Sequence, residues 1–199
     1  MNYVVTFGDK STLRNAPVGD VLDNPWDSTF LPETHFQMVL EKGVGFHARL
    51  WSYEKNPRIT YFENGSEVCE DSCLELFLNF APQKTTAFIN FEMKSDGTKL
   101  IGIGPDRYER YDIIGREVMP TVSAAVHEEY WEVELFVPLS LVEEFYGKCD
   151  FKPGYLMVGN VFKCGDLTES PHWLAWSPMN PQVSDFHRSD RFGTFQIGE

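Results

Sequence analysis

The chain has 199 residues, of which 42% are hydrophobic and 24% charged, a composition typical of a folded globular protein. Its 17 Lys and Arg residues against 30 Asp and Glu residues give a net charge of −13, which disfavours nucleic acid and membrane lipid as partners. No apolar run reaches the roughly 18 residues that a membrane span requires, and the length predicts a single domain over residues 1–199.

The N-terminal region lacks the basic and apolar segments of a secretory signal, which predicts a cytoplasmic protein. No two of the four cysteines form a CxxC pair, so we expect reduced thiols and no zinc motif. Residues 9–32 are rich in Pro, Gly, Asn and Asp and are interpreted as a long surface loop. The oxygen-rich part of this loop, from Asp20 to Asp27, does not have the spacing of a calcium loop. We therefore predict no cofactor, with calcium left open.

Short runs of alternating apolar and polar residues follow along the chain, separated by turn residues. One segment, 138–146, begins with Pro and has apolar residues at near-helical spacing, which predicts a short helix. The pattern predicts an all-β fold, a two-sheet antiparallel β-sandwich with one short helix. The expected strands cover residues 36–41, 45–53, 73–80, 86–94, 99–103, 121–127, 130–137, 155–163 and 191–197.

Three of these strands carry an unusual polar face opposite the apolar one. Because side chains alternate along a strand, each strand can be divided into two faces. The faces opposite the apolar ones combine aromatic rings with Arg, Glu and Asn, which together suit the C–H faces and hydroxyl groups of a sugar. The alternative is a loop-covered face with Arg49 and Glu75 paired across strands. The candidate site residues on this predicted face are Arg49, Trp51, Glu75, Asn90 and Glu92.

Trp176 is a further candidate because Ser177-Pro178 ends regular structure directly after it. A tryptophan at this position can stack on a ligand or can fill the end of the sandwich, and the residues alone leave both interpretations open. Adjacent carboxylates such as Glu132 and Glu134 are expected by chance in so acidic a chain and do not by themselves indicate a glycosidase pair. No P-loop, GxSxG or dinucleotide motif is present.

Five segments resemble, in order, the motifs of family 9 carbohydrate-binding modules, which are DOMON-like β-sandwiches. The resemblance implies a ligand-facing Glu75, a sugar-stacking Trp176 and metal ions, usually calcium, in some members. Modules of this family are usually exported and fused to glycoside hydrolases, so the resemblance leaves export with such a partner open. The segments are Asp71–Leu78, Phe91–Gly97, Trp131–Leu139, Gly159–Lys163, and Trp173–Pro178 followed by Phe186-His187 and Arg191–Gly193.

We therefore predict a non-catalytic protein that binds carbohydrate, with glucose- or xylose-configured sugars preferred because axial hydroxyl groups obstruct stacking. The alternatives are a sandwich-type glycoside hydrolase or lyase that uses Glu75 and a second carboxylate, a haem protein with Met93 or a His as ligand, and a protein–protein module. The oligomeric state is not predicted. The expected ligand-binding residues are Trp176, Glu75, Trp51, Arg49, Asn90, Glu92 and Asn160.

Overall fold

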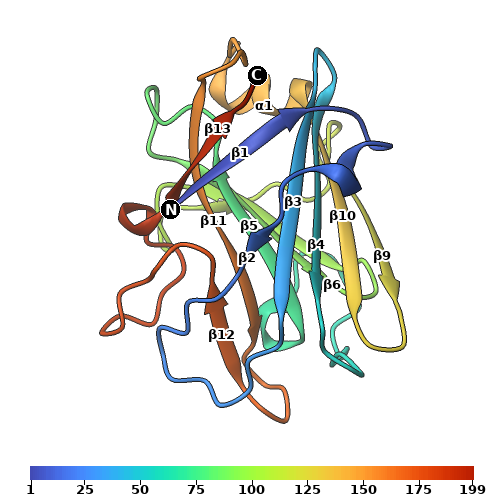
Figure 1. Ribbon diagram of the computed structural model, residues 1–199. Coiled ribbons are helices and arrows are strands. Elements are labelled where there is room, and N and C mark those ends of the chain that lie inside the picture. Colours follow the sequence, from blue (N-terminus) through green and yellow to red (C-terminus); the bar gives the residue numbers. More distant parts are fainter.

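The computed structural model describes all residues, 1–199. Its strands form two layers packed face to face (Figure 1), which confirms the predicted β-sandwich. We call one of these layers sheet A. Its strands, in spatial order, are β8 (Tyr111–Asp112), β7 (Lys99–Gly104), β6 (Phe88–Lys94), β5 (Cys73–Asn79), β11 (Leu156–Gly165) and β13 (Gly193–Ile197), with β12 (His172–Ala175) also paired to β11.

The second layer, sheet B, is built mainly from antiparallel neighbours. Strand β1 (Asn2–Phe7) joins the two sheets, because its first four residues pair with β13 and its last two residues pair with β3. Both of these pairings are parallel, whereas every other strand pair is antiparallel. The other strands of sheet B are β3 (Thr34–Glu41), β4 (Gly45–Ser52), β10 (Trp131–Pro138) and β9 (Thr121–Val126), with the two-residue β2 (Gly19–Asp20) on β3.

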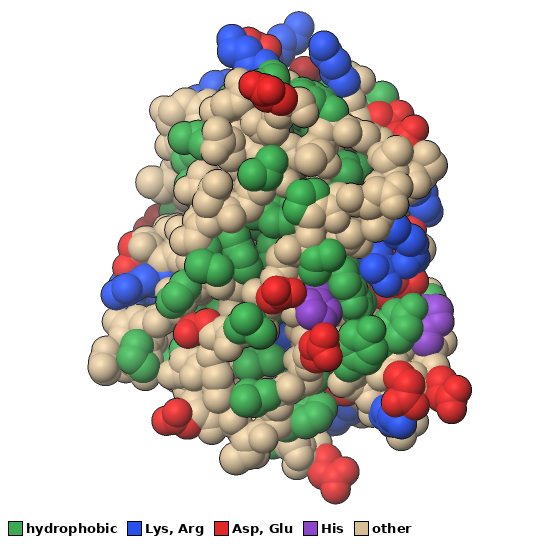
Figure 2. All heavy atoms as spheres, in the orientation of Figure 1, with side chains coloured by type: hydrophobic (Ala, Val, Ile, Leu, Met, Phe, Trp, Pro, Cys, Tyr) green, Lys and Arg blue, Asp and Glu red, His purple; other side chains and the backbone are tan.

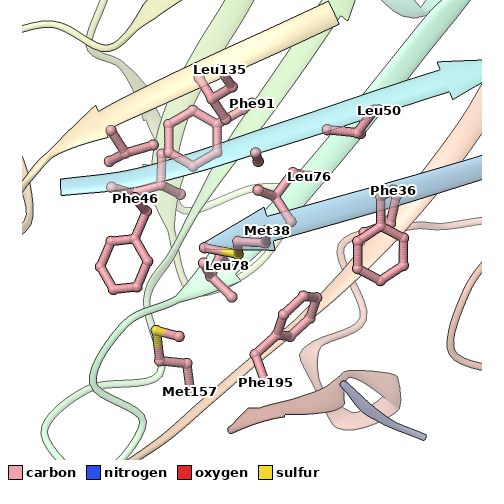
Figure 3. Packing of buried hydrophobic residues seen from close by; sticks show 14 of the residues in the cluster. Phe36, Met38, Phe46, Leu50, Leu76, Leu78, Phe91, Leu135, Met157 and Phe195 are labelled. Atoms are coloured by element: carbon pink, nitrogen blue, oxygen red, sulfur yellow. The ribbon is translucent and has the colours of Figure 1, made fainter. Parts of the chain in front are cut away.

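The core lies between the two sheets, and it explains why the strands alternate in sequence. Phe46 and Leu50 of β4 lie in the same core as Leu76 of β5 and Phe91 of β6 (Figure 3). These side chains belong to one cluster of 33 buried residues. Since each fully buried large apolar side chain contributes about 1.5–3 kcal/mol, this interface is the main source of stability. Side chains at alternate positions therefore point away from the core, in opposite directions on the two sheets.

Helical segments are few and short. The predicted helix is confirmed as α1 (Leu139–Tyr146), which packs Leu141, Val142 and Tyr146 into the core. Single 3-10 turns occur at η1 (Leu13–Asn15), η2 (Val68–Glu70) and η3 (Ser189–Arg191). None of the helices combines the length and the apolar character needed to span a lipid bilayer.

The N-terminal third differs most from the sequence-based prediction. β1 was not predicted, although it joins the two sheets. The segment interpreted as a surface loop contains η1 and β2 and buries Leu13 and Val21. Trp26, in the same segment, packs against Trp173 and Phe186, so this segment covers part of sheet A.

Candidate functional site

The outer face of sheet A contains a cavity of about 490 Å³. Its floor is formed by side chains that point away from the core, namely Glu75 of β5, Asn90 and Glu92 of β6, and Cys164 of β11. All four are buried by the segments that surround the cavity. The cavity is therefore a polar depression in an otherwise closely packed sheet face.

Strand pairing brings the floor residues together. Glu75 lies directly opposite Glu92 in the antiparallel pair of β5 and β6. The Asn90 amide donates a hydrogen bond to Oε1 of Glu92 at 2.7 Å, and the Cys164 thiol donates one to Oε1 of Glu75 at 2.9 Å. The prediction that Glu75, Asn90 and Glu92 share one face is thus confirmed as geometry.

The electrostatics of the floor are unusual because neither Glu75 nor Glu92 forms an ion pair. Burial raises the pKa of Glu92 to about 7. Burial and the neighbouring Glu92 carboxylate raise the pKa of Glu75 well above its ordinary value. A buried carboxyl group whose charged form has no close cationic partner favours the protonated state. At neutral pH the floor therefore offers both hydroxyl donors and carboxylate acceptors to a bound molecule.

An aromatic wall stands beside this floor. Trp26 and Trp173 both line the cavity, with ring centroids 6.4 Å apart, and Trp26 stacks on Phe186 at 5.1 Å. The Trp173 indole donates a hydrogen bond to Asp166 at 2.7 Å, which holds the ring in place. Each of the three rings is only partly buried. They offer apolar surface to a ligand that lies on the floor.

The remaining wall carries cationic and ionisable side chains. Arg110 donates a hydrogen bond to Oδ1 of Asn90, and its guanidinium lies 5.0 Å from the ring centroid of Phe88. Nδ1 of His187 is buried, and it lies 3.3 Å from Oδ1 of Asp185 without the geometry of a hydrogen bond. Burial and the nearby Arg110 lower the pKa of His187 to about 4, so the imidazole is neutral at pH 7. Arg107 also lines the cavity and is exposed.

The predicted residues Arg49 and Trp51 do not lie at this cavity. They are on the outer face of sheet B, which points away from sheet A. Arg49 Nε donates to Oε2 of Glu132 at 2.5 Å, and the Arg49 guanidinium lies 4.1 Å from the Trp51 ring centroid. The sequence-based assignment of one shared face is therefore wrong. β4 has the predicted alternation, but it belongs to the other sheet.

Trp176 also requires a correction, because it fills the core. The side chain is 4% exposed, and its ring packs at centroid distances of 5.6 Å from Phe36 and 5.0 Å from Phe195. A Cβ atom at Gly193 would lie 2.5 Å from the Trp176 ring, so this close approach requires glycine. Of the two interpretations left open, filling the sandwich is the one observed.

Asn160 is fully buried and holds a turn. Its side-chain oxygen accepts hydrogen bonds from the backbone N–H groups of Val161 and Ser177, and its amide donates to the Ser177 carbonyl at 2.9 Å. These contacts use its polar atoms, and it does not line the cavity. Its assignment as a ligand contact is therefore replaced by a structural role.

Met93, considered as a haem ligand, lies in the core.

The acidic residues from Asp20 to Asp27 make contacts within the protein. Asp20 lies 2.7 Å from Nδ1 of His35, and Oδ2 of Asp23 accepts a hydrogen bond from the Met179 N–H at 2.9 Å. The Asn24 side-chain oxygen accepts a hydrogen bond from the Ser28 N–H at 2.9 Å, and the Asn24 amide donates to the Ser28 carbonyl at 3.1 Å. The absence of a calcium requirement stays a prediction.

Sequence reasoning did not identify Trp26 and Trp173 as cavity residues. Trp173 and Trp176 are neighbours in sequence, but β12 directs Trp173 to the outer face and Trp176 emerges on the core side. Period-2 alternation along residues 172–175 would have separated Trp173 from Leu174, which is buried in the core. No local signal connects Trp26 to this site, because its partners Trp173 and Phe186 lie far away in the sequence.

Figure 2 shows one face of the molecule, where hydrophobic side chains are interspersed with acidic ones and basic side chains lie mainly at the top and along the right edge of the view. The distribution agrees with the net charge of −13. This face is therefore a surface of mixed character.

The sequence matches the family model described as Carbohydrate-binding family 9 over residues 6–197. This match covers nearly the whole chain, and the chain belongs to this family. No curated protein that was compared matches the sequence.

Solved structures give the same fold. A protein from Bacteroides uniformis ATCC 8492, to which carbohydrate binding has been attributed, superposes with a TM-score of 0.83 at 24% identity, covering 98% of each chain. A family 9 carbohydrate-binding module from Caldicellulosiruptor kristjanssonii, in complex with cellotriose, has a TM-score of 0.69 at 9% identity and covers 100% of this chain and 94% of that one. Its complex with glucose gives 0.70 at 10% identity, with 100% and 97% covered.

The family match confirms the predicted class, a carbohydrate-binding protein that is not an enzyme. It does not favour the alternative glycoside hydrolase, even though Glu75 and Glu92 lie opposite each other in the cavity. The sequence resemblance on which the prediction was based is confirmed as well. Which residues contact the sugar is a separate question.

Proposed function

We propose that the cavity on the outer face of sheet A binds a glucose-configured sugar, with Glu75, Asn90 and Glu92 below the ring and Trp26 and Trp173 beside it. The observation that carries the proposal is the aromatic wall standing next to buried carboxyl and amide groups in one cavity. Its volume of about 490 Å³ lies within the range of small-ligand sites. Such a volume admits a monosaccharide or the end of a short chain.

The chemistry of the walls fits a flat sugar. A glucose ring with equatorial substituents presents C–H faces that stack on an indole, and its hydroxyl groups project sideways toward polar groups. Each hydroxyl both donates and accepts, which suits a floor holding protonated and ionised carboxyl groups and the Asn90 amide. The family 9 module complexes with cellotriose and glucose support this choice of ligand.

The test is titration calorimetry of the purified chain with glucose, cellobiose, cellotriose, xylobiose, galactose and mannose. We expect measurable binding of the glucose- and xylose-configured sugars and weaker binding of galactose and mannose, whose axial hydroxyl groups obstruct stacking. Glu75→Gln and Asn90→Ala should weaken binding, whereas Gln37→Ala, on the outer face of sheet B, is the matched control. Equal losses in the cavity variants and the control, or no binding of any of these sugars, would contradict the proposal.

A further inference from the structure

Two cysteines and a glutamate converge at one part of the cavity floor. Cys73 of β5 lies directly opposite Cys164 of β11, and Glu75 follows Cys73 on the same face of β5. Their exposed fractions are 0%, 1% and 2%. Cys164 and Glu75 line the cavity, so the group is buried but adjoins open space.

The donor atoms of the three residues lie close together. The Cys164 thiol donates to Oε1 of Glu75 at 2.9 Å, and one ligand atom from each of the three residues lies within 4.8 Å of the others. A tetrahedral zinc ion with Zn–S near 2.3 Å and Zn–O near 2.0–2.2 Å holds such donors about 3.5–3.8 Å apart. The observed separations differ from this spacing by only about 1 Å, so small side-chain adjustments bring the three donors to the corners of a zinc site.

We propose that Cys73, Glu75 and Cys164 bind a zinc-class divalent cation, with the fourth coordination position open to the cavity. Two thiolates and one carboxylate form a donor set that binds zinc in preference to calcium and magnesium, which favour oxygen ligands alone. Glu75 has no ion-pair partner that would compete with the metal, and the cavity supplies a route of entry.

Charge and proton balance are simple. Binding removes the thiol protons of Cys73 and Cys164, and the carboxyl proton where Glu75 carries one, and releases them to solvent. The ion with two thiolates and one carboxylate has a net charge of −1, in place of neutral thiols beside an unpaired carboxyl group. No oxidation or reduction takes place.

This metal site goes beyond the proposed sugar binding, shares Glu75 with it, and is tested without sugar, so that either proposal can fail alone. The reduced, metal-free full chain is titrated with Co²⁺, a spectroscopic substitute for zinc, and zinc affinity is measured by competition with a chromophoric chelator. We expect one equivalent of metal and thiolate-to-cobalt charge-transfer absorption. Cys164→Ser should weaken zinc binding by more than about tenfold, because a hydroxyl is a poor substitute for a thiolate.

Cys149→Ser is the matched control, because the Cys149 thiol lies outside the cavity, 3.7 Å from Nζ of Lys84. Its zinc affinity should equal that of the unmodified chain. Equal affinities of the Cys164→Ser and Cys149→Ser proteins, or a cobalt spectrum without thiolate charge transfer, would overturn the proposal. Thermal unfolding verifies that each variant is folded. If Cys164→Ser does not fold, the cobalt spectrum of the unmodified chain and the zinc affinity of Glu75→Gln decide, and an unchanged affinity in Glu75→Gln overturns the three-ligand site.

Discussion

On the outer face of sheet B, Glu132 accepts hydrogen bonds from the guanidinium groups of Arg14 and Arg49, whereas on the outer face of sheet A Glu75 and Glu92 lie opposite each other without an ion pair. The pKa of Glu132 is lowered to about 2, because the hydrogen bonds and charges of the two arginines outweigh its burial. The pKa of Glu92 is raised to about 7 by burial. Carboxyl groups thus form an ion-paired network on one face, whereas on the other they are hydrogen-bonded but have no ion pair.

The difference shows which polar face can recognise a ligand. On sheet B, the Arg49 guanidinium lies over the Trp51 ring and donates a hydrogen bond to Glu132. These three side chains already contact one another and do not line a cavity as large as the one on sheet A. On sheet A, Trp173 and Glu75 line an open cavity. Residue composition alone therefore does not identify a binding face, and unpaired buried groups beside a cavity are the more informative signal.

The largest expected effect of a substitution is on stability at sheet B. Glu132→Ala removes the carboxylate shared by two arginines and leaves Arg49, whose side chain is 11% exposed, without its partner. We expect the free energy of unfolding to fall by about 3 kcal/mol, measured by denaturant unfolding. Glu134→Ala, which removes a more exposed carboxylate from the same face, should cost less than about 1 kcal/mol. Equal losses in the two variants would break the distinction.

A smaller effect, on the affinity for sugar, should distinguish Trp173 of sheet A from Trp51 of sheet B. Trp173→Ala removes a ring of the cavity wall, and we expect sugar binding to weaken by about 1–3 kcal/mol, or roughly tenfold to a hundredfold, in calorimetry. Trp51→Ala should leave the affinity of the folded protein unchanged. The comparison fails if Trp51→Ala weakens binding and Trp173→Ala does not.

The two faces should also respond to pH with opposite signs. Glu92 binds its proton more tightly in the folded than in the unfolded chain, so its contribution makes stability decrease as pH rises from about 4.5 to about 7. Glu132 binds its proton less tightly when folded, so its contribution is present above about pH 4.5 and is lost as pH falls toward about 2. We expect each effect to be on the order of 1–2 kcal/mol.

Unfolding free energies measured across this pH range for Glu92→Gln and Glu132→Gln test these signs. Glu92→Gln should reduce the decrease between about pH 4.5 and 7, to which Glu75 also contributes, and Glu132→Gln should reduce the loss below about pH 4.5. If both variants changed the pH profile in the same window and with the same sign, the two carboxyl groups would not have the opposite environments described above.

The smallest effect is expected in the acidic segment from Asp20 to Asp27. Asp23 accepts a hydrogen bond from the Met179 N–H, so this segment resembles sheet B in having its acidic groups satisfied within the protein. Millimolar calcium should therefore leave the melting temperature nearly unchanged in differential scanning fluorimetry. A rise of several degrees that disappears in Asp23→Ala would place a metal site here.

The fold was predictable from sequence to the extent that it depends on local pattern. The alternation of Phe46, Ala48 and Leu50, and of Leu74, Leu76 and Leu78, correctly identifies the core side of β4 and β5. β1 escaped prediction because it is defined by long-range parallel pairing with β13 and β3.

The candidate site was predictable only in part, for the same reason. Glu75, Asn90 and Glu92 lie on adjacent strands of one hairpin, so their common face follows from local pattern. Arg49 and Trp51 have the same alternation, but no local feature tells which sheet β4 joins. Trp26 reaches the cavity from a segment far away in sequence, which requires the completed fold.

The central claim is that sugar binds at the cavity of sheet A, and the most direct test is to measure which of the five tryptophans respond to the sugar. Each indole N–H gives its own signal in a ¹H–¹⁵N NMR spectrum, and the five residues sample the cavity wall (Trp26, Trp173), the outer face of sheet B (Trp51) and the core (Trp131, Trp176). Titration with cellotriose should shift the signals of Trp26 and Trp173 and leave that of Trp51 in place. A shift of the Trp51 signal with Trp26 and Trp173 unmoved would contradict the account.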